Sequence, residues 1–159
     1  MEIEIIEDYK QSLFVYKNGE LLFYSTIKFS FLRKNIIKIF DSNDELVLEL
    51  KSYETPFSLA KFEILFQNKD KTKNINEITK VYLTFDQNQT IRRIGENHFS
   101  FNLKSSYFIN KIKLADIKLK FWTSTQKMSL NLNLEYEEFL DSIIFHVLST
   151  RTGYNSNSV

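Results

Sequence analysis

Near its C-terminus the chain carries a segment with the period of a helix and no charge on any side. From residue 136 the apolar side chains recur at 136, 139, 140, 143, 144, 147 and 148, the spacing of one helical face. Residues 142–149 include no charged side chain, and Phe145 adds an apolar ring opposite that face. A helix that is apolar all round is buried on every side. We therefore predict a buried helix over about 135–150, with Gly153 as its C-terminal stop.

The residues before this helix follow the period of β-strands. Between residues 2 and 134 about ten to twelve stretches read as strands, and many alternate apolar with polar side chains, as in KVYLTF, DIKLKFW and MSLNLNL. Asn18-Gly19 stands between two apolar runs, which is typical of a type I′ hairpin because both turn residues need a positive φ. This part of the chain is thus predicted to be antiparallel β-structure.

Together these patterns predict an all-β fold with one helix, a closed antiparallel barrel of about twelve strands around a central, buried C-terminal helix. Closure removes exposed sheet edges, and the helix fills a lumen too wide for side chains alone. Phe139, Ile143, Ile144, Val147 and Leu148 should then be buried. The alternative is a helix packed across the open end of a β-sandwich or barrel. The 159 residues fit a single domain, with strands over about 2–134, the helix over about 135–150 and a disordered tail over about 154–159.

Charge and targeting signals favour a cytoplasmic protein. The net charge is +1, from 21 basic and 20 acidic side chains, so the chain has no global attraction to nucleic acid or to an acidic membrane. The start, MEIEIIEDYK, carries four acids where a secretory signal needs basic and then apolar residues. Residues 142–149, the longest uncharged apolar stretch, are too few to span a bilayer. We expect no transmembrane segment, and a location in the cytoplasm or peripheral at the membrane.

One region has a local excess of positive charge. Between residues 104 and 127 there are six lysines and one acid, Asp116. Because strand side chains alternate, two of these lysines share one face, and two others share a face with the only tryptophan. If residues 115–116 form the tip of a hairpin, all four lysines cluster beside the indole. The candidate ligand-binding residues are Lys111, Lys113, Lys118, Lys120 and Trp122.

Such a patch could hold a phosphate-bearing partner, such as an anionic phospholipid head group or a nucleic acid. The alternative is a solvated outer face of the barrel, where lysine also protects sheets from edge pairing. Lysine lacks the bidentate fork of arginine, so the pattern does not favour sequence-specific recognition of nucleic acid.

The sequence contains no recognisable catalytic motif. It has no cysteine, which excludes disulfides, thiolate metal sites and a cysteine nucleophile. Its two histidines, His98 and His146, lack any metal-binding spacing, and no nucleophile elbow, P-loop or dinucleotide fingerprint occurs. We expect His98 to face solvent and His146 to be a core imidazole hydrogen-bonded to a backbone carbonyl or to buried water. The expectation is a protein that is not an enzyme, with no catalytic residue, no cofactor and no metal.

The residues 101–150 resemble the closing half of the tubby C-terminal-like superfamily, which includes LURP-one-related proteins and phospholipid scramblases. The similarity consists of an alternating strand with Lys-Ser-Ser-Tyr-Phe at 104–108, two further strands and a final hydrophobic helix. The run 38–51 is similar to the superfamily's unit of strand, polar turn and strand. The resemblance implies one tubby-like barrel domain of twelve strands around a central helix. By analogy it also implies binding of phosphoinositide-like lipid, whereas the missing cysteines depart from the palmitoylated segment of the scramblases.

These observations favour a non-enzymatic binding module for anionic lipid at a membrane surface. Two alternatives stay open, a lipocalin-like carrier of a small apolar ligand and a protein–protein interaction domain. A carrier keeps an apolar cavity for its ligand, whereas a helix threaded through the barrel fills that volume. The threaded helix therefore predicts a lumen without a large internal pocket.

Overall fold

The computed structural model describes residues 1–31, 34–55, 58–95, 104–120 and 124–154. In this part of the chain twelve strands form one antiparallel sheet in the order β6-β5-β4-β3-β2-β1-β12-β11-β10-β9-β8-β7. The strands are β1 (Glu2–Glu7), β2 (Leu13–Lys17), β3 (Glu20–Lys28), β4 (Lys34–Asp41), β5 (Leu46–Thr55), β6 (Ser58–Gln67), β7 (Ile75–Ile78), β8 (Tyr82–Phe85), β9 (Gln89–Gly95), β10 (Lys104–Ile109), β11 (Ile112–Leu119) and β12 (Lys127–Leu132). The predicted number of strands and their antiparallel arrangement are confirmed.

The alternating sequences form strands with one face toward the lumen. In β1, Ile3 and Ile5 are fully buried, whereas Glu2 and Glu4 are exposed. The β2–β3 connection is the predicted hairpin, and its turn residues Asn18-Gly19 have φ values of 52° and 81°. The pattern of period two therefore decides which side chains fill the barrel.

The sheet curls into a nearly closed barrel whose seam lies between β6 and β7. A single bridge, Lys61 to Thr79, links the backbones there. The Gln67 side chain adds two hydrogen bonds to β7, donating to the Ile75 carbonyl at 3.0 Å and accepting from the Ile75 amide at 2.8 Å. An amide side chain thus satisfies backbone groups that a full strand pair would otherwise bond.

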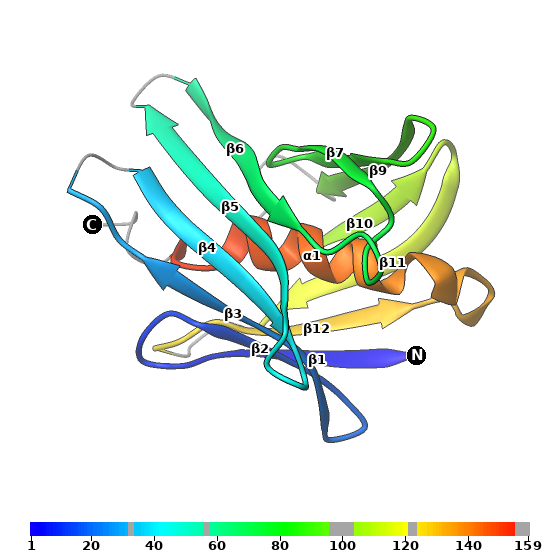
Figure 1. Cartoon of the computed structure of the whole chain (residues 1–159). Helices are drawn as coiled ribbons and strands as arrows, with labels where there is room; N and C mark the ends of the chain where they lie inside the picture. Colours follow the sequence, from blue (N-terminus) through cyan, green and yellow to red (C-terminus); the bar gives the residue numbers. More distant parts are fainter. Residues whose placement is uncertain (32–33, 56–57, 96–103, 121–123, 155–159) are drawn as a thin grey trace.

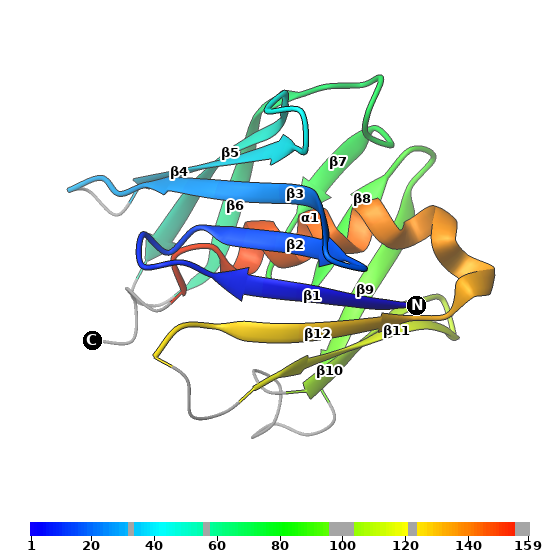
Figure 2. The ribbon, with the colours of Figure 1, turned by 90° about the horizontal axis from the view of Figure 1, so that it is seen from below.

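The C-terminal helix runs through the lumen, as Figures 1 and 2 show from two directions. The α-helix α1 spans Leu140–Arg151 and follows a 3-10 helix, η1, over Leu134–Phe139. The predicted helix is thus correct in place, but its first turns are not α-helical. Phe139 is the only buried side chain in η1, so little packing favours a regular α-helix there.

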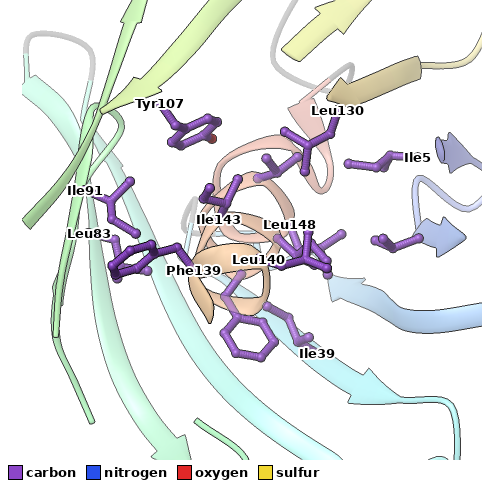
Figure 3. Packing of buried hydrophobic residues seen from close by; sticks show 14 of the residues in the cluster. Ile5, Ile39, Leu83, Ile91, Tyr107, Leu130, Phe139, Leu140, Ile143 and Leu148 are labelled. Carbon is purple, nitrogen blue, oxygen red and sulfur yellow. The ribbon is translucent and has the colours of Figure 1, made fainter. Parts of the chain in front are cut away.

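The core forms where α1 meets the inner faces of the strands. The five helix residues predicted to be buried are at most 8% exposed, and Phe145 is 1% exposed. Figure 3 shows Ile5, Ile39, Leu83 and Leu130 directed at the helix from strands on different sides of it. Phe145 packs edge-on against Phe23 of β3, with ring centroids 5.1 Å apart. The threaded arrangement is confirmed, and the helix laid across an open end is excluded.

α1 ends in a left-handed turn that only glycine adopts without strain. Gly153 has a φ of 73°, and a Cβ atom built there would lie 2.4 Å from Ile27 Cδ1. Of the predicted C-terminal tail, Tyr154 is described and residues 155–159 lie outside the described residues.

We expect Gly153→Ala to lower the free energy of unfolding by more than Gly19→Ala does. Both glycines have a positive φ, which costs an L-residue about 1–2 kcal/mol. A Cβ atom at Gly19 meets nothing within 4 Å, whereas one at Gly153 collides with Ile27. Urea unfolding of the two variants measures the difference, and equal losses would show that the contact with Ile27 relaxes without cost.

Candidate functional site

Four lysines gather on the outer face of three neighbouring strands. Lys104 of β10 lies directly opposite Lys118 of β11 in the strand register. Lys120 follows β11, and its amide donates to the carbonyl of Lys127 on β12 at 2.8 Å. Lys118, Lys120 and Lys127 are exposed and Lys104 is half-buried. We call these four residues the lysine cluster.

The cluster differs from the predicted patch because the hairpin tip lies elsewhere. Residues 115–116 are inside β11, and the turn between β10 and β11 is at Asn110, whose φ is 53°. The prediction of a tip at 115–116 is therefore wrong. Lys113 and Lys118 are separated by five residues of strand, or about 17 Å at the usual rise. Lys111 and Lys113 thus lie apart from Lys118 and Lys120, and Trp122 lies outside the described residues.

A β-bulge explains what the sequence pattern concealed. Tyr107 pairs with Ala115 and Phe108 pairs with Lys113, so Leu114 is an extra residue in β11. Leu114 and Ala115 are both buried in consequence. The break in alternation at residues 114–115 is therefore a bulge inside the strand, and not the hairpin tip considered at 115–116.

The bulge also brings Lys113 into an ion pair. It shifts the phase of β11, so that Lys113 and Asp116 share the outer face and form an ion pair of 2.7 Å. Burial opposes ionisation of Asp116, but hydrogen bonds from Lys113 and Ser106 outweigh it and hold the pKa of this carboxyl below its usual range. The charge of Lys113 is therefore compensated by Asp116 of the same strand, so Lys113 is a poor candidate for binding an anionic ligand.

The remaining lysines have less compensation. Within the described part of the chain, Lys118, Lys120 and Lys127 form no ion pair. Glu4 of β1 lies in the same cross-strand row as Lys118, with Ser129 of β12 between them. Like charges directly opposite each other on neighbouring strands destabilise a sheet, and an anion bound beside them would reduce this cost. The arrangement is therefore suited to bind a phosphate group on the outer wall of the barrel.

His146 is held inside the barrel by both ring nitrogens. Its Nε2 lies 2.8 Å from the Thr79 carbonyl oxygen, and its Nδ1 lies 2.8 Å from the Tyr107 hydroxyl. A carbonyl only accepts, so Nε2 carries the proton and Nδ1 accepts from Tyr107. Burial, aided by the positive charge of Arg93, lowers the pKa of His146 to about 3. The predicted core imidazole, bonded to a backbone carbonyl, is confirmed; His98 lies outside the described residues.

Two buried arginines near His146 were missed from the sequence. Arg93 is 7% exposed and donates from Nε to the Ser105 hydroxyl at 2.7 Å. Arg151, at the end of α1, is 2% exposed, and burial together with repulsion from Arg93 lowers its pKa to about 10. Its guanidinium lies 4.7 Å from the ring of Tyr154. Strict alternation in β9 places Arg93 on the same face as the buried Ile91, and this was the signal that could have identified it.

A hollow of about 640 Å³ opens at the end of the barrel where α1 begins. Leu22 and Phe23 form its apolar part, and charged side chains surround them. These charges compensate one another, because Lys17 pairs with Glu137 at 3.1 Å and Lys71 pairs with Asp41 and Glu45. Asp141 also lines the hollow and forms no ion pair within the described residues, so the lining keeps an excess of acid and does not favour an anionic ligand.

Metal binding and membrane insertion by a helix can be addressed only for the part of the chain that the structure describes. There, no group of three or more His, Asp or Glu side chains is placed to hold a metal ion. In the same residues no helix has the length and apolar character that crossing a bilayer requires.

Comparison of the chain with protein-family models, with curated proteins and with solved structures found no match. The resemblance to the tubby C-terminal-like superfamily therefore stays a prediction.

Proposed function

We propose that this chain is a non-enzymatic module of tubby-like type that binds anionic lipid at the cytoplasmic surface of a membrane. The lysine cluster is the observation that carries the proposal. Lys104 and Lys118 face each other across two strands, and Lys120 and Lys127 extend the positive surface to a third. The exposed ammonium groups of Lys118, Lys120 and Lys127 could pair with a phosphate-bearing head group, and the cytoplasmic leaflet presents such groups in large number.

Lysine suits this task better than specific recognition of one partner. Its ammonium group is a point charge without a fixed hydrogen-bonding fork, so it attracts phosphates without selecting a geometry. Each basic side chain close to an anionic bilayer contributes about 1 kcal/mol to binding. Four such residues on one wall are enough for reversible attachment that depends on salt.

The carrier alternative has less support. The helix residues Ile143, Ile144, Val147 and Leu148 occupy the lumen in which a lipocalin-like protein would hold its ligand, and each is at most 1% exposed. His146, the first candidate for a ligand contact in a carrier, has both nitrogens bonded to protein.

Replacing Lys118 and Lys120 by glutamine is expected to weaken binding to phosphatidylserine vesicles by about 30-fold. The loss of two charges near the bilayer corresponds to about 2 kcal/mol. Flotation at increasing salt measures it, because the attraction is screened over about 8 Å at physiological ionic strength. The matched control is K69Q/K111Q, which removes the same charge from the opposite end of the barrel.

The two double variants separate a local site from the general charge of the protein. Equal weakening by both would show that only net charge matters. Absence of flotation at low salt, or binding unchanged when the whole lysine cluster becomes glutamine, would remove lipid binding and leave a protein–protein interaction domain as the better reading.

A further inference from the structure

The topology gives the barrel two rims of different character. Successive strands are antiparallel neighbours, so every connection that follows an odd-numbered strand lies at one rim. This distal rim is where α1 ends, and the opposite, proximal rim is where η1 and the start of α1 lie (Figures 1 and 2). The lysine cluster is on the distal side, because Lys104 begins β10, Lys120 follows β11 and Lys127 begins β12.

Aromatic side chains stand fully exposed at the tips of two distal connections. Phe31, between β3 and β4, is 102% exposed, and Tyr9, between β1 and β2, is 86% exposed. Both connections are on the side of the barrel where α1 ends in each view of the ribbon (Figures 1 and 2). Large rings exposed together at loop tips mark an interaction site more clearly than scattered apolar residues do.

Local hydrogen bonds hold these rings outward. The Asp8 carboxylate accepts from the amides of Lys10 and Ser12, each at 2.9 Å, and this closes the turn that displays Tyr9. On the other connection the Ser30 amide donates to the buried Asn35 side chain at 3.2 Å. Tyr9 is therefore held in a hydrogen-bonded turn, and the residue before Phe31 is tied to the Asn35 side chain of β4.

Lysines flank both tips. Lys10 follows Tyr9 directly and its ammonium lies 5.6 Å from that ring. Lys28 and Lys34, at the ends of β3 and β4, are exposed on either side of Phe31. The β1–β2 connection also adjoins the lysine cluster, because Ile6 pairs with Lys127. Aromatic rings set among lysines are typical of surfaces that sit at the interface between lipid and water.

The two rims carry opposite charge among the described connections. At the distal rim the connections hold one acid, Asp8, and three lysines, Lys10, Lys80 and Lys120. At the proximal rim the acids outnumber the lysines by seven to four. The acids are Asp44, Glu45, Asp70, Asp86, Glu135, Glu137 and Glu138, and the lysines are Lys69, Lys71, Lys73 and Lys111. An anionic surface therefore attracts the described connections of the distal rim and repels those of the proximal rim, which favours one orientation of the barrel.

We infer that the distal rim docks end-on to an anionic bilayer, with Tyr9 and Phe31 inserted at the level of the head groups and Lys10, Lys28 and Lys34 beside lipid phosphates. This inference rests on the proposed function and adds to it the orientation of the protein and an apolar contribution. The lysine cluster supplies attraction from the adjoining wall. The inserted rings supply binding that salt does not screen.

The absence of cysteine allows a direct test by single labels. F31C and L134C are each labelled with an environment-sensitive fluorophore and mixed with vesicles of phosphatidylcholine containing phosphatidylserine. Leu134 is the control because it is 66% exposed at the proximal rim. We expect a blue shift of the emission for F31C and an unchanged spectrum for L134C.

The second arm removes the rings without changing charge. Y9S/F31S should bind these vesicles about tenfold more weakly than the unchanged chain and should lose the binding that persists at high salt. L134S/I112S removes two exposed apolar side chains outside the distal rim and should bind as the unchanged chain does.

The outcomes separate this inference from the proposed function. Flotation with an unshifted F31C label, or with a shifted L134C label, overturns end-on docking and leaves lipid binding in place. A shift of F31C that appears on concentrating the protein without vesicles assigns the rim to a second copy of the chain, and this also overturns the inference. No flotation at any salt overturns both proposals.

Discussion

Replacing Ile144 by aspartate is expected to prevent folding. Ile144 is fully buried where α1 passes through the lumen. The residues one turn away on the helix, at 140, 141, 147 and 148, include no basic side chain that could pair with a new carboxylate. An unpaired charge in such a place costs several kcal/mol in addition to the lost apolar burial of about 1.5–3 kcal/mol. Domains of this size have only about 5–15 kcal/mol of stability in all. Circular dichroism of the purified variant should show no cooperative unfolding.

Phe145→Asp is expected to prevent folding as Ile144→Asp does. This second variant tests specifically whether the helix passes through the barrel. Phe145 lies outside the main apolar stripe, so in a helix on the surface of a barrel it would face water and tolerate a charge. Here it is 1% exposed against Phe23. Ile112→Asp is the control, because Ile112 is 47% exposed and its substitution should leave the fold intact. A folded, cooperatively unfolding F145D protein would contradict the arrangement.

The fold could be predicted because two signals depend on local sequence alone. The alternation of apolar and polar residues in the strands indicates which strand face is buried. The helical spacing and the absence of charge at 142–149 indicate a helix that is buried on every side. The kink inside η1, at Tyr136, could not be predicted in this way. The apolar spacing continues through Phe139, but whether a turn is α-helical depends on packing that only the barrel supplies.

The candidate site was predicted in part, since its lysines were identified and their grouping was wrong. Leu114-Ala115 breaks the alternation of β11, and a hairpin tip and a bulge break it in the same way. The pairing of Lys104 with Lys118 and the approach of Lys127 depend on strand register, which the period of the sequence leaves open. The exposed rings of Tyr9 and Phe31 were missed because apolar residues in a connection carry no periodic signal.

Acidification from pH 6.5 to 4.5 is expected to destabilise the protein by about 2–3 kcal/mol through His146 alone. The pKa of His146 is about 3 in the folded protein and about 6.5 in the unfolded chain. Between these values the unfolded chain binds a proton that the folded protein does not, so stability falls as the pH falls through this window. Below about pH 3 the group makes no further difference. Tyr107, whose pKa burial raises to about 12, stays a donor to His146 throughout.

Urea unfolding at intervals between pH 5.0 and 6.5 measures this effect, because most Asp and Glu side chains titrate below this range of pH. H146Q should flatten the dependence by up to about 1.4 kcal/mol per pH unit, since glutamine does not titrate. H98Q removes the only other histidine of the chain and should leave the slope as it was. A flatter pH dependence of stability in H98Q, but not in H146Q, would contradict a buried, neutral His146 that joins Tyr107 to the Thr79 carbonyl at the barrel seam. The expected order of the two slopes follows from the geometry. A proton added to Nδ1 would turn the acceptor of the Tyr107 hydroxyl into a second donor. It would thereby break the chain of hydrogen bonds that links α1 to β10 and to Thr79, the residue after β7.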